Sequence, residues 1–261
     1  MKLQTKLAYS LGSGNSFCHG IQIDGHGIDD YFSNRVKGRF YDIEGTDELV
    51  QEFSDVVNTG FEISELENIF SSSTSTEPWK LGEAFSECYL EDHNNIRFPY
   101  PNSRDLKNPK SSLTGADLVG FFYENDITLF LFGEVKTSSE KKYPPQVVSG
   151  RSGLKQQLED IKSCHTTRNL LVMWLGFKVQ HLDDSNQDKL DYKNALKTYL
   201  TTHQQIKVIG VLIRDVIPKK TDLESRFNAL KTNLHPKMQL ELLALYFSFP
   251  VSTFVDKVGK Q

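Results

Sequence analysis

Residues 115–138 read GADLVGFFYENDITLFLFGEVKTS and have a strong local preference for β-strands. Aromatic and β-branched residues fill both of its halves, and Asn125 and Asp126 between them favour a tight turn. A two-residue loop at this turn pairs Glu124 with Ile127. The stretch therefore predicts an antiparallel hairpin with a defined register.

The register brings charged side chains together at the far end of the hairpin. Counting back from the turn places Asp117 opposite Glu134, and paired residues share a face of the sheet. Lys136 is two residues beyond Glu134 and lies on the same face, whereas Val135 points into the core. Two carboxylates and one ammonium group are thus predicted to converge.

These charges lie among apolar residues, where an unpaired charge is costly. Two close carboxylates are typical ligands of Mg²⁺, which activates water, and a neighbouring lysine orients the attacking hydroxide or offsets charge on a phosphoryl group. We therefore predict that Asp117, Glu134 and Lys136 catalyse metal-assisted phosphodiester hydrolysis. The alternative is a buried ion network that only holds the hairpin together.

A glutamate on a preceding helix is a further candidate. Residues 76–92 have helical periodicity, and Glu83 falls between the apolar residues Trp79 and Leu90. Glu83 is either a third metal ligand or a first-turn glutamate favoured by the helix dipole. Glu87 on the same helix is the weaker candidate.

A glutamine follows the hairpin. The predicted helix 152–163 has an apolar stripe that includes Leu154 and Leu158, and Gln157 flanks this stripe. Its amide either positions a water or a phosphate in the site, or is an ordinary surface group beside the core.

Composition places the chain among globular proteins. Of its 261 residues, 38% are hydrophobic and 25% are charged, which suits one large domain or a domain with an appendage. No apolar run is long enough to cross a bilayer, so we expect a cytoplasmic protein without a membrane segment. The three scattered cysteines predict no disulfide or metal site, and the absence of a Gly-rich phosphate loop argues against an ATPase.

The net charge of −4 argues against a nucleic-acid-binding protein, but the charges are unevenly distributed. Residues 21–70 carry twelve acidic and three basic residues, whereas residues 136–168 carry seven basic and three acidic residues. This asymmetry fits a local phosphate-facing groove, and it fits a solvated lysine-rich surface equally well.

The order of the predicted elements indicates an α/β fold, with a mixed β-sheet flanked by helices. Residues 1–75 form a predicted acidic α+β region that ends in the Ser/Thr-rich stretch 71–76, and residues 76–261 form the main domain with a C-terminal helical part. The elements expected after the first helix are a loop (94–112), the hairpin strands (115–123 and 127–138), the helix 152–163, a buried strand (169–177), a helix (186–201), a buried strand (206–213), and two helical pieces from residue 221 that are broken near Pro236.

The same residues resemble the PD-(D/E)XK nuclease superfamily over about residues 76–215. The matching motifs are Gly82-Glu83, Gly115-Ala116-Asp117, Gly133-Glu134-Val135-Lys136 and Gln157. One departure is Ala116, which stands where the superfamily pattern has a proline.

The resemblance implies a restriction-endonuclease-like core and a metal-dependent deoxyribonuclease. It implies Asp117 and Glu134 as ligands of Mg²⁺, with Mn²⁺ as a substitute, and Lys136 as the catalytic lysine. It also implies that Glu83 is the additional carboxylate and that the backbone carbonyl of Val135 lies near the metal.

Within the superfamily, WKLGEAFSECYL (79–90), TGADLVGF (114–121) and FGEVKTS (132–138) resemble the HamA family, the nuclease subunits of Hachiman anti-phage defence systems. These work with a helicase, so the resemblance implies a DNA-cleaving effector in a hetero-complex. Residues 21–70 would then be a docking or inhibitory surface.

Two other functions remain open from the sequence. A stand-alone restriction or repair endonuclease would share the active site, but it should bind DNA without a partner and form dimers. A non-catalytic scaffold subunit would keep the fold, but its Asp117 and Glu134 should bind no Mg²⁺.

Overall fold

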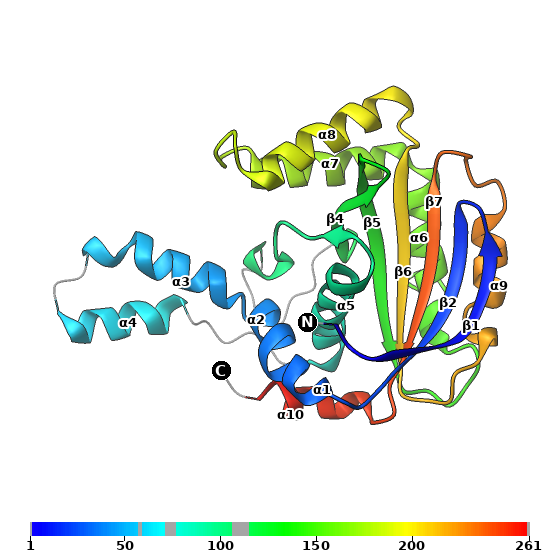
Figure 1. Cartoon of the computed structure of the whole chain (residues 1–261), viewed down its shortest axis with the longest axis horizontal. Coiled ribbons are helices and arrows are strands. Elements are labelled where there is room, and N and C mark those ends of the chain that lie inside the picture. The colour runs from blue at the N-terminus through cyan, green and yellow to red at the C-terminus, as the bar shows by residue number, and fades with distance from the viewer. Residues whose placement is uncertain (1, 57–58, 71–76, 106–114, 260–261) are drawn as a thin grey trace.

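The computed structural model describes residues 2–56, 59–70, 77–105 and 115–259. Within these ranges the strands form a seven-stranded mixed sheet in the order β1-β2-β7-β6-β5-β4-β3, with helices on both faces (Figure 1). The predicted α/β fold with a restriction-endonuclease-like core is confirmed. The strands are β1 (Thr5–Ser13), β2 (Ser16–Ile23), β3 (Ile96–Arg97), β4 (Leu118–Glu124), β5 (Ile127–Ser138), β6 (Ile206–Arg214) and β7 (Gln239–Tyr246).

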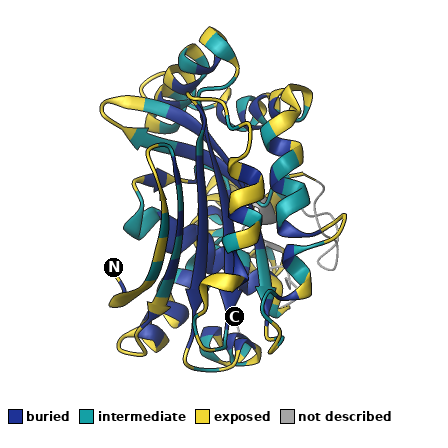
Figure 2. Cartoon of the chain, turned by 90° about the vertical axis from the view of Figure 1, so that its right-hand side faces the viewer, coloured by how far each residue is buried: buried dark blue, intermediate teal, exposed yellow. Residues whose placement is uncertain are grey.

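The central strands are parallel and the edges are antiparallel. β5, β6 and β7 run parallel to one another, and β2 is parallel to β7. β1 pairs with β2, β4 with β5 and β3 with β4, each in the antiparallel sense. The central strands are buried on both sides (Figure 2), as expected for parallel strands covered by helices.

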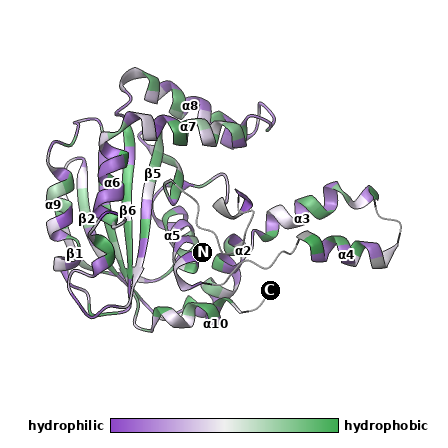
Figure 3. Ribbon diagram, turned by 180° about the vertical axis from the view of Figure 1, so that it is seen from behind, coloured by the Kyte–Doolittle hydropathy of each residue, from purple (hydrophilic) through white to green (hydrophobic). Residues whose placement is uncertain are grey.

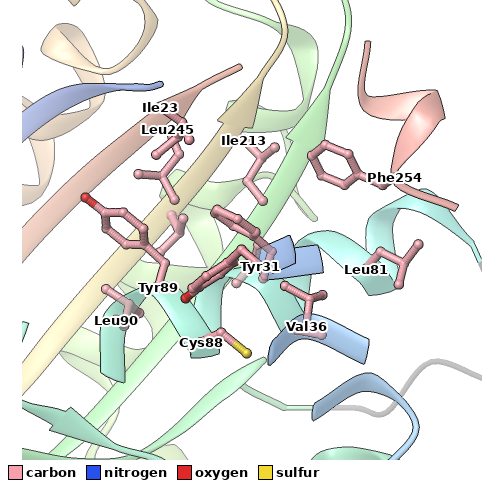
Figure 4. Packing of buried hydrophobic residues seen from close by; sticks show 14 of the residues in the cluster. Ile23, Tyr31, Val36, Leu81, Cys88, Tyr89, Leu90, Ile213, Leu245 and Phe254 are labelled. Carbon is pink, nitrogen blue, oxygen red and sulfur yellow. The ribbon is translucent and has the colours of Figure 1, made fainter. Parts of the chain in front are cut away.

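Two hydrophobic cores lie on the two faces of the sheet. On the first face, Tyr31, Leu81 and Phe254 pack near Ile213 of β6 (Figure 4). The helices on this face are α1 (Ile28–Asp30), the π-helix η1 (Tyr31–Val36), α2 (Lys37–Phe40), α5 (Pro78–His93) and α10 (Phe254–Val258). The helices on the second face are α6 (Leu154–Ser163), α7 (His165–Val179), α8 (Gln187–Thr202) and α9 (Glu224–Lys231).

The remaining helical segments connect or extend these layers. α3 (Ile43–Glu52) and α4 (Gly60–Phe70) project away from the sheet (Figure 1). The short 3-10 turns are η2 (Ser54–Val56), η3 (Asn102–Asp105), η4 (Gln146–Val148), η5 (Lys220–Asp222) and η6 (Val251–Thr253).

The predicted hairpin is present with its predicted register. Glu124 pairs with Ile127, and the ladder continues to the pair Leu118 and Gly133. Asn125 and Asp126 both have left-handed backbone conformations, with φ of 47° and 64°. Such a two-residue turn matches the twist of the flanking strands, which is why the local sequence fixes the register.

The prediction of a buried strand at residues 169–177 is wrong, because this segment lies within helix α7. Its buried residues Arg168, Val172, Leu175 and Val179 recur with helical spacing. Leu170, Met173 and Phe177 are each more than half exposed. A continuous apolar run is typical of a strand buried on both sides, but here it forms a helix that has apolar residues on its outer face too.

The prediction of a second helical piece after Pro236 is also wrong. Residues 239–246 form β7, which lies between β6 and β2 in the sheet. The leucines of QLELLALY have good helix propensity, but parallel pairing on both edges of the strand overrides it. The C-terminal part thus holds α9, β7 and α10 rather than helices alone.

The other predicted elements of the main domain are confirmed. The helices expected at 152–163 and 186–201 are α6 and α8, and the strand expected at 206–213 is β6. The first helix is α5, and its expected first residue, 76, lies outside the described residues.

The regions around this first helix are described in part. The predicted loop 94–112 contains β3 and η3, and its residues after 105 lie outside the described ranges, as does the stretch 71–76. Strands from before and after that stretch share one sheet, because β2 pairs with β7.

Candidate active site

The hairpin places Asp117 beside Glu134. Asp117 directly precedes β4, and the register of the ladder sets it opposite Glu134. The backbone N–H of Val135 donates a hydrogen bond of 2.9 Å to Asp117 Oδ2. This bond fixes the orientation of the Asp117 carboxylate at the end of the hairpin.

Glu134 and Lys136 form an ion pair on the same face. Lys136 Nζ lies 2.5 Å from Glu134 Oε1. Glu134 is only 4% exposed, and its second oxygen, Oε2, has no hydrogen-bond partner among the described residues. A buried carboxylate oxygen without a partner is costly, and a bound cation would remove that cost.

Burial and mutual repulsion perturb the acids of this site. Burial, followed by the charge of Asp117, raises the pKa of Glu134 to about 7. Burial also raises the pKa of Asp117. The pKa of Lys136 lies above its ordinary value: burial opposes this shift, but the hydrogen bond and charge of Glu134 outweigh it. The single lysine therefore does not neutralise the acids of this site, and a divalent cation would supply the missing positive charge.

Glu83 belongs to this group of acids. Burial, followed by the charge of Asp117, raises the pKa of Glu83 to about 9, and Glu134 adds to the same effect. The approach of α5 to the sheet depends on Gly82, because a Cβ atom there would lie 2.4 Å from Oγ1 of Thr137 in β5. The glycine lets the helix carry Glu83 close to the hairpin.

Glu87, one helical turn after Glu83, has a different role. Its Oε2 accepts a hydrogen bond from Nε of Arg39 in α2, and Glu87 is buried. The sequence left Glu83 and Glu87 as alternatives, with Glu83 favoured. In the structure Glu87 is paired with an arginine, whereas the pKa of Glu83 is raised by burial and then by the charges of Asp117, Glu87 and Glu134. Which of the two glutamates takes part in the site stays a prediction.

Gln157 lies on a helix that covers the same face as Glu134. Gly210 pairs with Glu134 in the parallel ladder, and Leu154 and Leu158 of α6 pack directly over Gly210. The half-buried Gln157 side chain has no hydrogen bond to the charged site residues within the described ranges. Its proposed role in positioning water or phosphate stays a prediction.

Within the described ranges, no group of three or more His, Cys, Asp and Glu side chains is arranged to hold a metal by itself. Asp117 and Glu134 lie opposite each other on one face of the hairpin, and their role as metal ligands stays a prediction. Mg²⁺ suits such a pair, because it is bound through one or two carboxylates and keeps several waters. The roles of Glu83 and of the Val135 carbonyl as ligands stay predictions.

Arg39 is a residue of this region that sequence reasoning missed. Besides Glu87, it donates a 3.1 Å hydrogen bond to the backbone carbonyl of Phe98. It lies 48 residues before Glu87 in the chain, so no local pattern links the two. Arg39 holds α5 in place behind Glu83.

Replacement of Glu83 by glutamine is expected to stabilise the metal-free protein at pH 8. The folded-state pKa of about 9 lies above the ordinary 4.5, so the contribution of this carboxyl to stability is present at low pH and is lost between about pH 4.5 and pH 9. Glutamine has no such dependence. We expect the melting temperature to rise by roughly 2–4 °C at pH 8, the shift that about 1 kcal/mol gives in a chain of this size.

Thermal unfolding at pH 5 and pH 8 in EDTA measures this effect. The gain should be larger at pH 8 than at pH 5, and exposed Glu65→Gln should change neither value. A lower melting temperature for Glu83→Gln at pH 8 would show that the carboxylate is stabilised in the folded protein by a group other than a metal.

A comparison with known protein families identifies a relationship. A family model described as HamA matches residues 17–260, a range that contains every candidate residue of the site. No curated protein matches the chain. Among the described residues, no helix is long and apolar enough to cross a membrane.

Proposed function

The chain belongs to the HamA family of the Hachiman anti-phage defence system, and from this premise we propose that it is the DNA-cleaving effector of such a system. It hydrolyses phosphodiester bonds with Mg²⁺ and acts together with a helicase. The observation that carries the proposal is the buried Oε2 of Glu134, which lacks a hydrogen-bond partner among the described residues and lies beside Asp117.

Each residue of the site has a distinct part in this reaction. Asp117 and Glu134 would hold the cation, and the Val135 N–H keeps the Asp117 carboxylate in its orientation. When bound, Mg²⁺ supplies a Lewis acid and a water molecule of lowered pKa. Lys136 is held next to the carboxylates by Glu134, where its ammonium group orients water or offsets charge on the phosphoryl oxygens.

Cleavage of plasmid DNA by the purified chain tests the proposal. The assay compares Mg²⁺, Mn²⁺ and EDTA, with and without the helicase encoded beside the chain, and includes RNA as a second substrate. We expect cleavage that requires a divalent cation and increases with the helicase. Equal cleavage without the helicase would indicate a stand-alone endonuclease. The absence of both cleavage and Mg²⁺ binding would indicate a scaffold subunit.

The substitution Lys136→Met separates catalysis from metal binding. Because Lys136 lies beside the carboxylates without being a metal ligand, we expect cleavage to fall by about 10²–10³-fold while Mg²⁺ affinity stays within a few-fold. Calorimetric titration and single-turnover cleavage measure the two quantities. Lys220→Met, an exposed lysine on η5, is the matched control and should change neither. A parallel loss of Mg²⁺ affinity would argue that Lys136 only organises the carboxylates.

A further inference from the structure

The segment 42–70, here called the arm, consists of α3, η2 and α4 and takes little part in either core. The views from the front and from behind both show the arm projecting from the rest of the molecule (Figures 1 and 3). Within α3, which is described throughout, Gly45 is the only buried residue. The arm therefore contributes surface rather than core to the fold.

The exposed surface of the arm is unusually apolar. Among the described residues of the arm, six large hydrophobic side chains are 39–67% exposed, a high number for a surface segment of this length. They are Ile43, Leu49, Phe53, Val56, Ile63 and Ile69. Two paired helices with this much exposed apolar area indicate a surface that another protein covers.

All charged residues of the arm are acidic. Residues 42–70 contain nine of the 34 acidic residues and none of the 30 basic residues. The rest of the chain then has 30 basic and 25 acidic residues, a net charge of +5. The overall charge of −4 is thus due to the arm, whose negative charge would repel DNA. The rest of the chain has a positive net charge, as DNA binding requires.

The base of the arm is fixed to the body by charged contacts. Asp42 accepts hydrogen bonds from Nε and Nη2 of Arg104, the latter at 2.9 Å. Gly45 makes room for this arginine, because a Cβ atom at residue 45 would lie 2.0 Å from Arg104 Nη2. Just before the arm, Arg39 binds Glu87. The arm is therefore held in a set direction, which lowers the entropic cost of binding.

We propose that the arm is the docking element for a protein partner that offers an apolar groove bordered by lysine and arginine. This rests on the proposed function, in which the partner is the helicase subunit. A second copy of the chain is a poorer occupant. The arm of one copy would cover the basic segment of the other, residues 136–168, which could then no longer bind DNA. Such a contact between copies would also be head-to-tail, and head-to-tail contacts form open chains unless the geometry closes a ring.

Binding of the purified helicase to the full chain, measured by calorimetry at low and physiological salt, tests the proposal. The first arm variant is Glu48→Lys/Glu52→Lys, and the second is Leu49→Ser/Ile69→Ser. We expect the charge variant to bind at least about tenfold more weakly, with a flatter salt dependence, and the apolar variant to weaken binding at both salt concentrations. The matched control, Asp183→Lys/Asp256→Lys, reverses two exposed charges off the arm and should bind as the wild type does.

Three results would overturn the proposal. These are wild-type affinity in both arm variants, no binding of the helicase to the wild type, and self-association of the wild type that either arm variant abolishes. All variants should keep the wild-type melting curve and Mg²⁺ titration, because the substituted residues are exposed and lie outside the site. A wild type that binds the helicase through the arm but binds no Mg²⁺ would overturn the nuclease proposal alone.

Discussion

Glutamine in place of Glu134 is expected to reduce cation-dependent cleavage by at least about a thousandfold, which corresponds to about 4 kcal/mol of transition-state stabilisation. The substitution keeps the size of the side chain and an oxygen that can accept from Lys136, but it removes the negative charge that would bind the cation. Mg²⁺ affinity should fall with activity. Single-turnover cleavage and calorimetric titration measure both.

Stability distinguishes this loss from unfolding. The pKa of Glu134 is raised to about 7, so at pH 8 the folded protein carries a carboxylate that burial and Asp117 disfavour. Glu134→Gln should thus be at least as stable as the wild type without metal. Glu124→Gln, at the exposed turn end of the same hairpin, is the control and should cleave normally. Cleavage retained by Glu134→Gln would place the active site elsewhere.

The substitution Arg214→Met is expected to destabilise the protein by about 3–5 kcal/mol, the cost of breaking a buried ion pair from one side. Arg214 is fully buried at the end of β6, and its guanidinium donates 3.0 Å hydrogen bonds to the backbone carbonyls of Ser138 and Lys142. Its Nε lies 3.4 Å from Oδ2 of the equally buried Asp222. Methionine leaves a buried carboxylate and two carbonyls without this partner.

Urea unfolding measures the change, with Arg97→Met as the matched control. Arg97 pairs with Asp188, but its side chain is 47% exposed, so its loss should cost less than about 1 kcal/mol. The double substitution Arg214→Met/Asp222→Leu should recover part of the stability, because it removes both charges. A small effect of Arg214→Met would mean that water replaces the arginine in the folded state.

The parts of the site that the sequence predicted are those that local chemistry determines. The turn at Asn125 and Asp126 sets the register of the hairpin, and alternation then places Asp117, Glu134 and Lys136 on one face. No tertiary information is needed for this step. The same holds for two helices. The apolar spacing of α6 and the N-terminal cap of α8 are both visible in the local sequence.

The errors occurred where tertiary contacts decide. Residues 169–177 are apolar on several sides, and only the position of α7 at the edge of the fold explains the exposed Leu170 and Phe177. Residues 239–246 are a strand because β2 and β6 pair with them on both sides. Likewise, the ion pair between Glu87 and Arg39 joins distant segments of the chain, so no local pattern could predict it.

The position of β7 has a consequence for the order of folding. β2 near one end of the chain pairs with β7 near the other, so closing the sheet requires contacts across nearly the whole sequence. Such non-local pairing slows folding, whereas the β4–β5 hairpin can form from neighbouring residues. Until β7 is synthesised, the β1–β2 pair cannot join the rest of the sheet, and one edge of β6 has no neighbouring strand. The two acids of the hairpin are thus available early, but the sheet that holds them is completed only after β7 has been synthesised.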